Sequence, residues 1–101
     1  MIRYGRRAIR DLQEIKDYLE PLNPLATRRV FATIKSKITA LETFPQMGKL
    51  VDVHGTRRIS VGRYPYVIFY EISGDDVIVM HIRHTAREPF YPNGEPRGSS
   101  R

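Results

Sequence analysis

The chain has 101 residues, 41% of them hydrophobic, which predicts one globular domain and excludes a disordered chain. The absence of cysteine excludes disulfide bonds and thiolate metal sites. A net charge of +6 favours an acidic partner, although a basic surface kept for solubility remains an alternative.

The first predicted element is an amphipathic helix within residues 8–22. Apolar side chains recur there at alternating steps of four and three, as on one face of a helix. Because proline cannot occupy a helix interior, Pro21 ends this helix near residues 18–20. The opposite, solvent-facing side is expected to carry Asp11, Glu14 and Tyr18.

A second helix is predicted from Asn23–Pro24 to about Phe44. Asparagine is a favourable N-cap and proline a favourable first helical residue. The short connection predicts that the two helices form an antiparallel hairpin.

Three strands are predicted after a loop at residues 45–55, because the apolar period changes from 3.6 to 2. They cover residues 57–61, 66–72 and 77–83, and Ile2–Tyr4 can add a short edge strand. The expected fold is α+β, with the helix hairpin packed on a three- to four-stranded antiparallel sheet. We expect residues 1–90 to form the folded domain and residues 91–101 an irregular tail.

The same periodicities predict which side chains form the core. On the last strand, one face should carry Ile78, Met80 and Ile82, and the other His81 and Arg83. The residues expected in one common core are Leu12, Ile15, Leu19, Val30, Ile34, Ile38, Ile59, Ile68, Ile78 and Met80.

The sequence contains no motif typical of an enzyme or of a cofactor site. A Gly-rich phosphate loop and a nucleophile elbow are both missing. His54, His81 and His84 are scattered, so neither a metal nor any cofactor is expected. Neither a signal peptide nor an apolar run of about 18 residues occurs, and we expect a cytoplasmic protein without a membrane partner.

Several short stretches, in this order and spacing, resemble the ParE branch of the RelE/ParE toxin superfamily. They are Asn23-Pro24, Arg58-Ile59, Tyr64-Pro65-Tyr66 and the ending His84-Thr85-Ala86-Arg87. The resemblance covers about residues 2–90 and implies a toxin of a bacterial type II toxin–antitoxin module, of the plasmid stabilisation type. It also implies a hetero-oligomer with a ParD-like antitoxin, whose typically acidic tail suits the charge of +6.

The superfamily divides by target: ParE-like members inhibit DNA gyrase, and RelE-like members cut mRNA on the ribosome. Many nuclease members have an arginine at the start of the central strand, where this chain has Pro65-Tyr66. This departure favours gyrase binding without a catalytic residue and leaves mRNA cleavage as the alternative. A third alternative is a member that retains only its antitoxin as a partner.

The candidate target-binding residues are basic or aromatic side chains of the sheet and the ending. They could form a docking surface for gyrase, a modest RNA site in which aromatic rings stack on bases, or ordinary sheet positions. The set is Arg57, Arg58, Arg63, Tyr64, Tyr66, His84 and Arg87.

Overall fold

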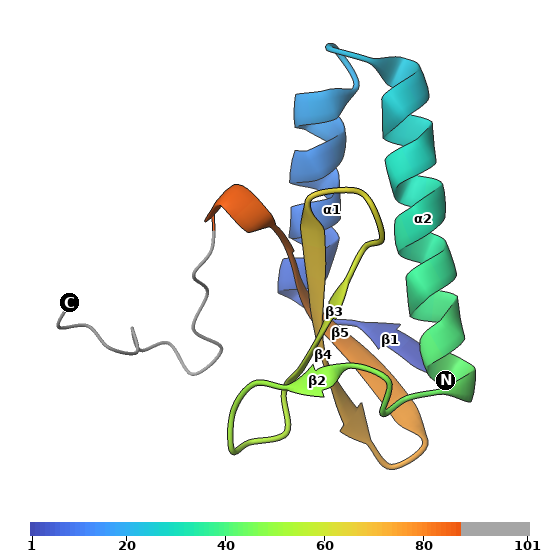
Figure 1. Ribbon diagram of the computed structural model, residues 1–101, viewed down its shortest axis with the longest axis vertical. Helices are drawn as coiled ribbons and strands as arrows, with labels where there is room; N and C mark the ends of the chain where they lie inside the picture. Colours follow the sequence, from blue (N-terminus) through green and yellow to red (C-terminus); the bar gives the residue numbers. More distant parts are fainter. Residues whose placement is uncertain (88–101) are drawn as a thin grey trace, which may run out of the picture.

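The computed structural model describes residues 1–87, so the expected tail at residues 91–101 lies outside the described residues. Two helices follow a first strand, and four more strands complete the sheet (Figure 1). The elements are β1 (Ile2–Tyr4), α1 (Arg6–Leu19), α2 (Pro24–Thr43), β2 (Lys49–Leu50), β3 (Arg57–Ser60), β4 (Tyr66–Ser73), β5 (Asp76–His84) and the short 3₁₀ helix η1 (Thr85–Arg87). Across residues 1–87, neither helix combines the length and apolarity needed to span a membrane.

The sheet has five strands in the order β1-β5-β4-β3-β2. The expected α+β class is confirmed, but the expected three or four antiparallel strands were too few. β1 pairs in parallel with β5, and β2 adds a second edge beside β3. β2 could not be predicted because a strand of two residues shows no alternation of apolar and polar side chains. The direction of β1 could not be predicted because its partner, β5, follows both helices in the chain.

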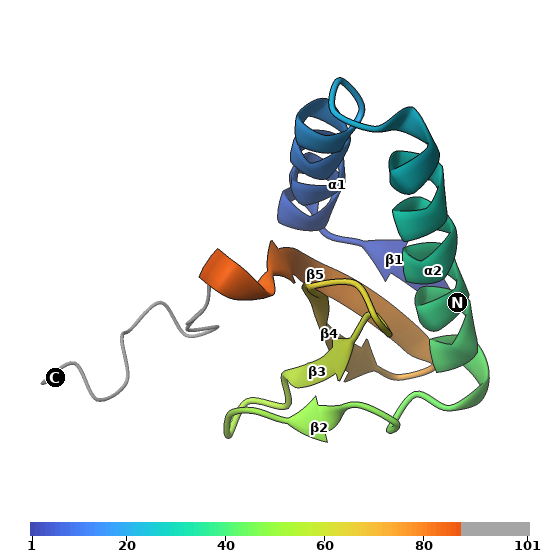
Figure 2. The same ribbon diagram turned by 45° about the horizontal axis from the view of Figure 1, so that its top comes forward.

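Both helices lie on the same side of the sheet, and α1 packs mainly against β5 (Figure 2). Asn23 caps α2 as predicted, because its side-chain oxygen accepts the Ala26 N–H at 3.0 Å. α1 begins two residues before the predicted start. Gly5 joins β1 to α1 and donates its N–H to the Val79 carbonyl at 2.8 Å, which fixes the helix against β5.

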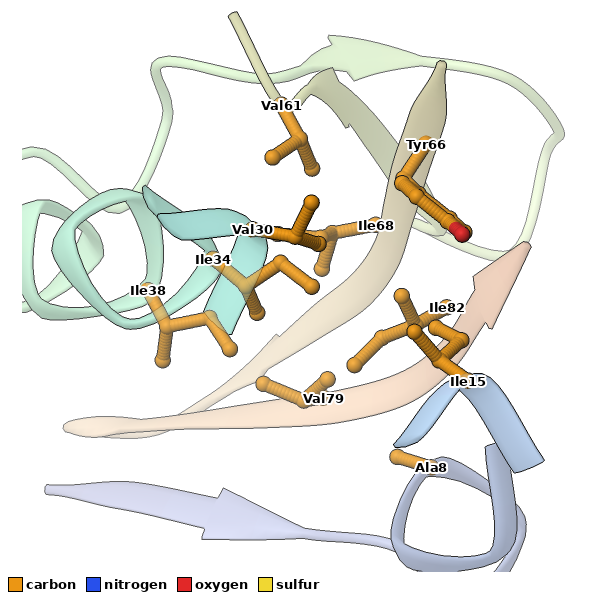
Figure 3. Packing of buried hydrophobic residues seen from close by; sticks show 10 residues of the cluster. All are labelled: Ala8, Ile15, Val30, Ile34, Ile38, Val61, Tyr66, Ile68, Val79 and Ile82. Carbon is orange, nitrogen blue, oxygen red and sulfur yellow. The ribbon is translucent and has the colours of Figure 1, made fainter. Parts of the chain in front are cut away.

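The core lies between the helix pair and the sheet (Figure 3). Its buried residues from α1 and α2 are Ala8, Ile15, Val30, Ile34 and Ile38, and the sheet side contributes Val61, Tyr66, Ile68, Val79 and Ile82. Five predicted core residues are therefore confirmed as buried. Three more, Leu12, Leu19 and Ile59, are partly buried and pack against this cluster.

The prediction that Ile78 and Met80 of β5 point into the core was wrong. Val77 and Val79 are buried, whereas Ile78 is half-buried and Met80 is 36% exposed. The cause is a β-bulge: Tyr70 pairs with Val79 but Phe69 pairs with His81, which leaves Met80 as an extra residue. Beyond the bulge the alternation changes phase, so Ile82 returns to the core as predicted.

Tyr70 of β4 fixes the loop that follows α2. Its hydroxyl accepts the Gly48 N–H at 2.8 Å and donates to the Pro45 carbonyl at 2.7 Å. The approach is so close that a Cβ on residue 48 would lie 2.6 Å from this hydroxyl oxygen. Glycine is therefore required at position 48, and the loop delivers β2 to the edge of the sheet.

Candidate functional site

A cavity of about 260 Å³ lies between α1 and the ends of β4 and β5. Its wall is mixed, with carboxylates and a tyrosine from the helix opposite aromatic, cationic and apolar groups from the sheet. The lining residues are Asp11, Glu14, Ile15, Tyr18, Tyr66, Ile82, Arg83, His84 and Ala86.

Two aromatic rings form the sheet side of this cavity. Tyr66 and His84 are paired across β4 and β5, and their rings meet edge to face with centroids 5.2 Å apart. The His84 Nδ1 accepts the Ala86 N–H at 2.9 Å. In the neutral imidazole this bond places the proton on Nε2, which makes Nε2 a hydrogen-bond donor.

The helix side of the cavity contains a buried carboxylate. Asp11 is 4% exposed and was wrongly expected on the solvent face of α1. One of its oxygens, Oδ2, accepts the Ile82 N–H at 2.9 Å and lies 2.6 Å from His81 Nδ1. The other oxygen, Oδ1, accepts from Arg7 Nε at 3.2 Å.

The reason for burying Asp11 is the short length of β1. The pairing of β1 with β5 ends at Tyr4 opposite Val79, so within residues 1–87 no strand lies beside the later backbone N–H groups on this edge of β5. The Asp11 carboxylate takes the place of that strand for Ile82. A buried N–H without such an acceptor would cost about 1–3 kcal/mol.

His81 is buried beside this carboxylate, and its pKa is lowered from the usual 6.5. Burial is the main cause, because it disfavours the charged imidazolium. Asp11 opposes the shift, whereas the positive charges of Arg7 and Arg83 add to it. His81 is therefore neutral at pH 7.

Of the sequence-predicted site residues, Tyr66 and His84 meet in the cavity. Tyr66 is also 5% exposed and belongs to the core. Tyr64 is partly buried against the same core, and Arg63 is exposed in the loop between β3 and β4. The backbone of Arg87 lies in η1, and its side chain is outside the described part of the chain.

The two arginines of β3 lie apart from this cavity. Arg57 Nη1 donates to the Gly48 carbonyl at 2.8 Å and to the Gln46 carbonyl at 3.3 Å, so it holds the loop after α2. Arg58 is half-buried and pairs in register with Phe69. The seven predicted residues therefore do not form one constellation in residues 1–87.

Sequence reasoning missed the helix side of the cavity. Asp11, Glu14 and Tyr18 are spaced i, i+3 and i+7, so they share one face of α1. That spacing was the available signal, but it was interpreted as a solvent-facing stripe. In the part of the chain that the structure describes, no three His, Asp or Glu residues gather as a metal site would require.

Comparison with known proteins assigns the chain to a family. The family described as "ParE toxin of type II toxin-antitoxin system, parDE" matches residues 2–89. A Sinorhizobium fredii protein, Y4kP, named only as a candidate toxin, is 40% identical over 82 residues, which are 79% of this chain and 85% of Y4kP. The protein named Toxin RelE2 of Caulobacter vibrioides is 37% identical over 81 residues, or 80% of this chain and 90% of RelE2.

A solved structure has the same fold. It is described as "Chromosomal ParDE TA system from P. aeruginosa" and superposes with a TM-score of 0.72. The match covers 82% of this chain and 92% of the other at 21% sequence identity. At that identity, the likeness confirms the two-helix, mostly antiparallel α+β fold.

Proposed function

Because the chain belongs to the ParE toxin family of type II toxin–antitoxin systems, we propose that it inhibits DNA gyrase by binding and that a ParD-like antitoxin neutralises it. The family match over residues 2–89 is the observation that carries this proposal. The toxin would act in the cytoplasm and be stored there as a hetero-oligomer with its antitoxin.

The placement of the cationic residues supports binding over chemistry. Arg57 is engaged with loop carbonyls and Arg63 lies on an exposed loop, and neither lines the cavity in which Tyr66 and His84 meet. A catalytic site for phosphodiester cleavage needs its proton acceptor, cation and acid close to one phosphate. Dispersed basic and aromatic residues are instead typical of a docking surface.

The charge of the chain supports an acidic antitoxin. Residues 21–65 carry a net charge of +6, equal to that of the whole chain, and Arg28, Arg29 and Lys35 are exposed on α2. The structural neighbour from P. aeruginosa is itself described as a ParDE system. Opposite charges of this kind accelerate association and exclude basic partners.

The cavity provides a specific reason to keep mRNA cleavage as a second candidate. Glu14, Arg83 and His84 all line this one hollow. These are groups that can take a proton, give a proton and stabilise a phosphorane. One relative is named RelE2, which adds to this alternative.

Two assays on the purified toxin separate the candidates. We expect inhibited DNA supercoiling by gyrase, gyrase-dependent DNA breaks and intact mRNA in a cell-free translation reaction. Codon-spaced mRNA cuts with normal supercoiling would establish the nuclease instead. Inhibition of neither process would leave the antitoxin as the sole partner.

The antitoxin part of the proposal has its own test. The protein encoded by the neighbouring gene should relieve growth inhibition and form a stable complex with the toxin at physiological salt. Contacts between exposed charges at the rim should weaken as salt rises, because screening acts beyond about 8–10 Å. Two purified proteins that fail to associate at about 0.15 M salt would remove this part of the proposal.

A further inference from the structure

Two polar groups that line the cavity lack a partner in the part of the chain that the structure describes. On α1, the exposed Glu14 makes neither a hydrogen bond nor an ion pair there. On β5, His84 uses Nδ1 as an acceptor, and its Nε2–H donates to no described group. Asp11 differs, because the Ile82 N–H and Arg7 already occupy its two oxygens. The cavity therefore offers one unused carboxylate and one unused N–H donor.

An aromatic ring and an apolar interior complete the cavity. Tyr18 lies one turn after Glu14 on α1, so the two side chains share one face of the helix. Tyr18 is 62% exposed, so a flat ligand can stack on its ring. The buried lining residues are Ile15, Tyr66 and Ile82, which belong to the core (Figure 3). The cavity therefore combines a polar, open mouth with a preformed apolar interior.

The size and charge of the cavity limit the ligand that it can take. Its volume of about 260 Å³ lies just below the roughly 300–1,000 Å³ of sites for drug-sized molecules, which suits one small ring system. Glu14 and Arg83 both line it, so a simple anion would be repelled by the first and a simple cation by the second. The ligand should therefore be a flat, uncharged ring system that carries both donors and acceptors.

Guanine has the hydrogen-bonding pattern that this cavity requires. Its N1–H and N2–H₂ groups are adjacent donors on one edge, and a carboxylate such as Glu14 can accept from both. Its O6 and N7 are acceptors on another edge, where the Nε2–H of His84 can donate. Adenine instead places an acceptor on each side of its N6 amino group, so one of them would face the carboxylate. Pyrimidines offer a single ring, and thus a smaller face for stacking on Tyr18.

We propose that the cavity is a binding pocket for a guanine base. Glu14 accepts from N1–H and N2–H₂, His84 donates to O6 or N7, and Tyr18 stacks on the rings. The base can belong to a free nucleotide or to a single-stranded nucleic acid, whose phosphates are attracted by the charge of +6. Binding of a base needs no cleavage, so this proposal rests neither on gyrase inhibition nor on mRNA cleavage.

Calorimetric titration of the full chain with GMP, IMP and AMP tests the pocket. The three nucleotides carry the same ribose and phosphate, so only the base differs. GMP should bind most tightly, and IMP, which lacks the N2 amino group, should bind about tenfold more weakly. AMP should bind about a hundredfold more weakly than GMP. Equal affinities for GMP and AMP would overturn the proposal.

Two substitutions with matched controls locate the site on α1. Glu14→Gln removes one acceptor and should weaken GMP binding about tenfold, whereas Glu20→Gln makes the same change at the exposed C-cap, outside the cavity, and should bind as the wild type does. Tyr18→Ala should also weaken binding about tenfold, and Leu22→Ala, at another exposed position, should not. All four residues are exposed, so these variants should keep the wild-type fold, which thermal melts check. Equal losses in the two glutamine variants would assign the effect to net charge and overturn the proposal.

A single-stranded uridine hexanucleotide with one central guanine distinguishes the two sources of the base. Tighter binding of this strand than of GMP would assign the pocket to nucleic acid, and the reverse order would assign it to a free nucleotide. Either order supports the pocket if Glu14→Gln weakens the tighter ligand about tenfold. The same strand with a central adenine is the control. Equal binding of the two strands without binding of GMP would show attraction of phosphates alone and overturn the proposal, as would no binding of any probe.

Discussion

Asp11 and His81 are the residues whose roles depend most on their surroundings. A carboxylate on an amphipathic helix is ordinarily exposed, yet Asp11 is buried because it completes the backbone hydrogen bonding of β5. The carboxylate also accepts a hydrogen bond from Arg7 Nε and lies 2.6 Å from His81 Nδ1. Asp11 is the member of this cluster that lines the cavity, and its bond to the Ile82 N–H fixes α1 against the sheet.

Removing the Asp11 carboxylate should therefore destabilise the fold. Asp11→Ala leaves the buried Ile82 N–H without an acceptor, and we expect a loss of about 1–3 kcal/mol in the free energy of unfolding. Urea denaturation measures it. Glu14→Ala, one turn away and exposed, should change stability by less than about 0.5 kcal/mol. Equal losses in the two variants would contradict the role given to Asp11.

Burial of neutral His81 predicts a pH-dependent stability. Its pKa in the folded protein is lowered, so the unfolded chain binds this proton more readily. The stability contribution is complete above the unfolded pKa of 6.5 and is lost as pH falls from there toward the folded pKa. Thermal melts at pH 7.5 and 5.5 should show a lower Tm at pH 5.5. The decrease should be smaller in His81→Gln, and an equal decrease would assign it to other groups.

At the scale of elements, a few contacts position the edge strands. β2 has two residues, and its place depends on the Tyr70 hydroxyl more than on strand propensity. β5 depends on the bulge at Met80, which aligns Val79 and Ile82 with the core. The Tyr70–Gly48 bond joins residues 22 positions apart, and the bulge is a shift of register within the β4–β5 hairpin.

Tyr70→Phe tests how the loop after α2 is held. The variant loses the bonds to Gly48 and Pro45 while keeping the ring, so we expect a loss of about 1–3 kcal/mol in urea denaturation. Tyr18→Phe removes an exposed hydroxyl and should have little effect. Unchanged stability of Tyr70→Phe would show that the loop is held by other contacts.

The bulge in β5 predicts different losses of stability for two residues that the sequence analysis placed in the core, Ile34 and Met80. Ile34→Ala should cost about 2–5 kcal/mol because it leaves a cavity in a buried cluster. Met80→Ala should cost less than about 1 kcal/mol, since Met80 is a partly exposed bulge residue. Denaturant midpoints of the two variants measure the difference. A larger loss for Met80→Ala would place that side chain inward and argue against the bulge.

At the scale of the whole molecule, a basic chain presents two separate surfaces. The cavity lies at the ends of β4 and β5, and the exposed strand β2 forms one edge of the sheet, separated from β5 by β4 and β3. Two surfaces on one small domain allow a target and a regulatory partner to bind without competing for the same residues. The proposed gyrase inhibition needs no chemical step at either of them.

Single substitutions should therefore reduce inhibition in a graded way. If binding to gyrase is the activity, Arg63→Ala, His84→Ala and Arg87→Ala should each weaken it by about 1–3 kcal/mol, measured as the toxin concentration that halves supercoiling. Tyr66→Phe is the matched change at the buried ring, because Tyr66→Ala would also disturb the core. A single substitution that lowers activity about a hundredfold or more would indicate a lost proton-transfer group and favour the nuclease.

The candidate site was partly predictable from the sequence. Tyr66 and His84 were named and do meet in the cavity, because both lie at the ends of strongly patterned strands. Arg57 was also named, but it holds a loop, since its nearest acceptors come from residues 46 and 48. The contribution of α1 was missed because helical periodicity shows which residues share a face and not what that face contacts.

The sequence by itself determined the two helices, the three long strands, most of the core and the toxin family. These depend on local periodicity, on capping by Asn23 and Pro24, and on motifs read in order along the chain. Only the tertiary structure decided the direction of β1, the edge at β2, the bulge at Met80 and the burial of Asp11. Asp11 and Ile82 are 71 residues apart, and β1 pairs with β5 across both helices. The bulge is a shift of register between β4 and β5, and the place of β2 depends on the Tyr70 hydroxyl. The periodicity along one segment does not record such pairings.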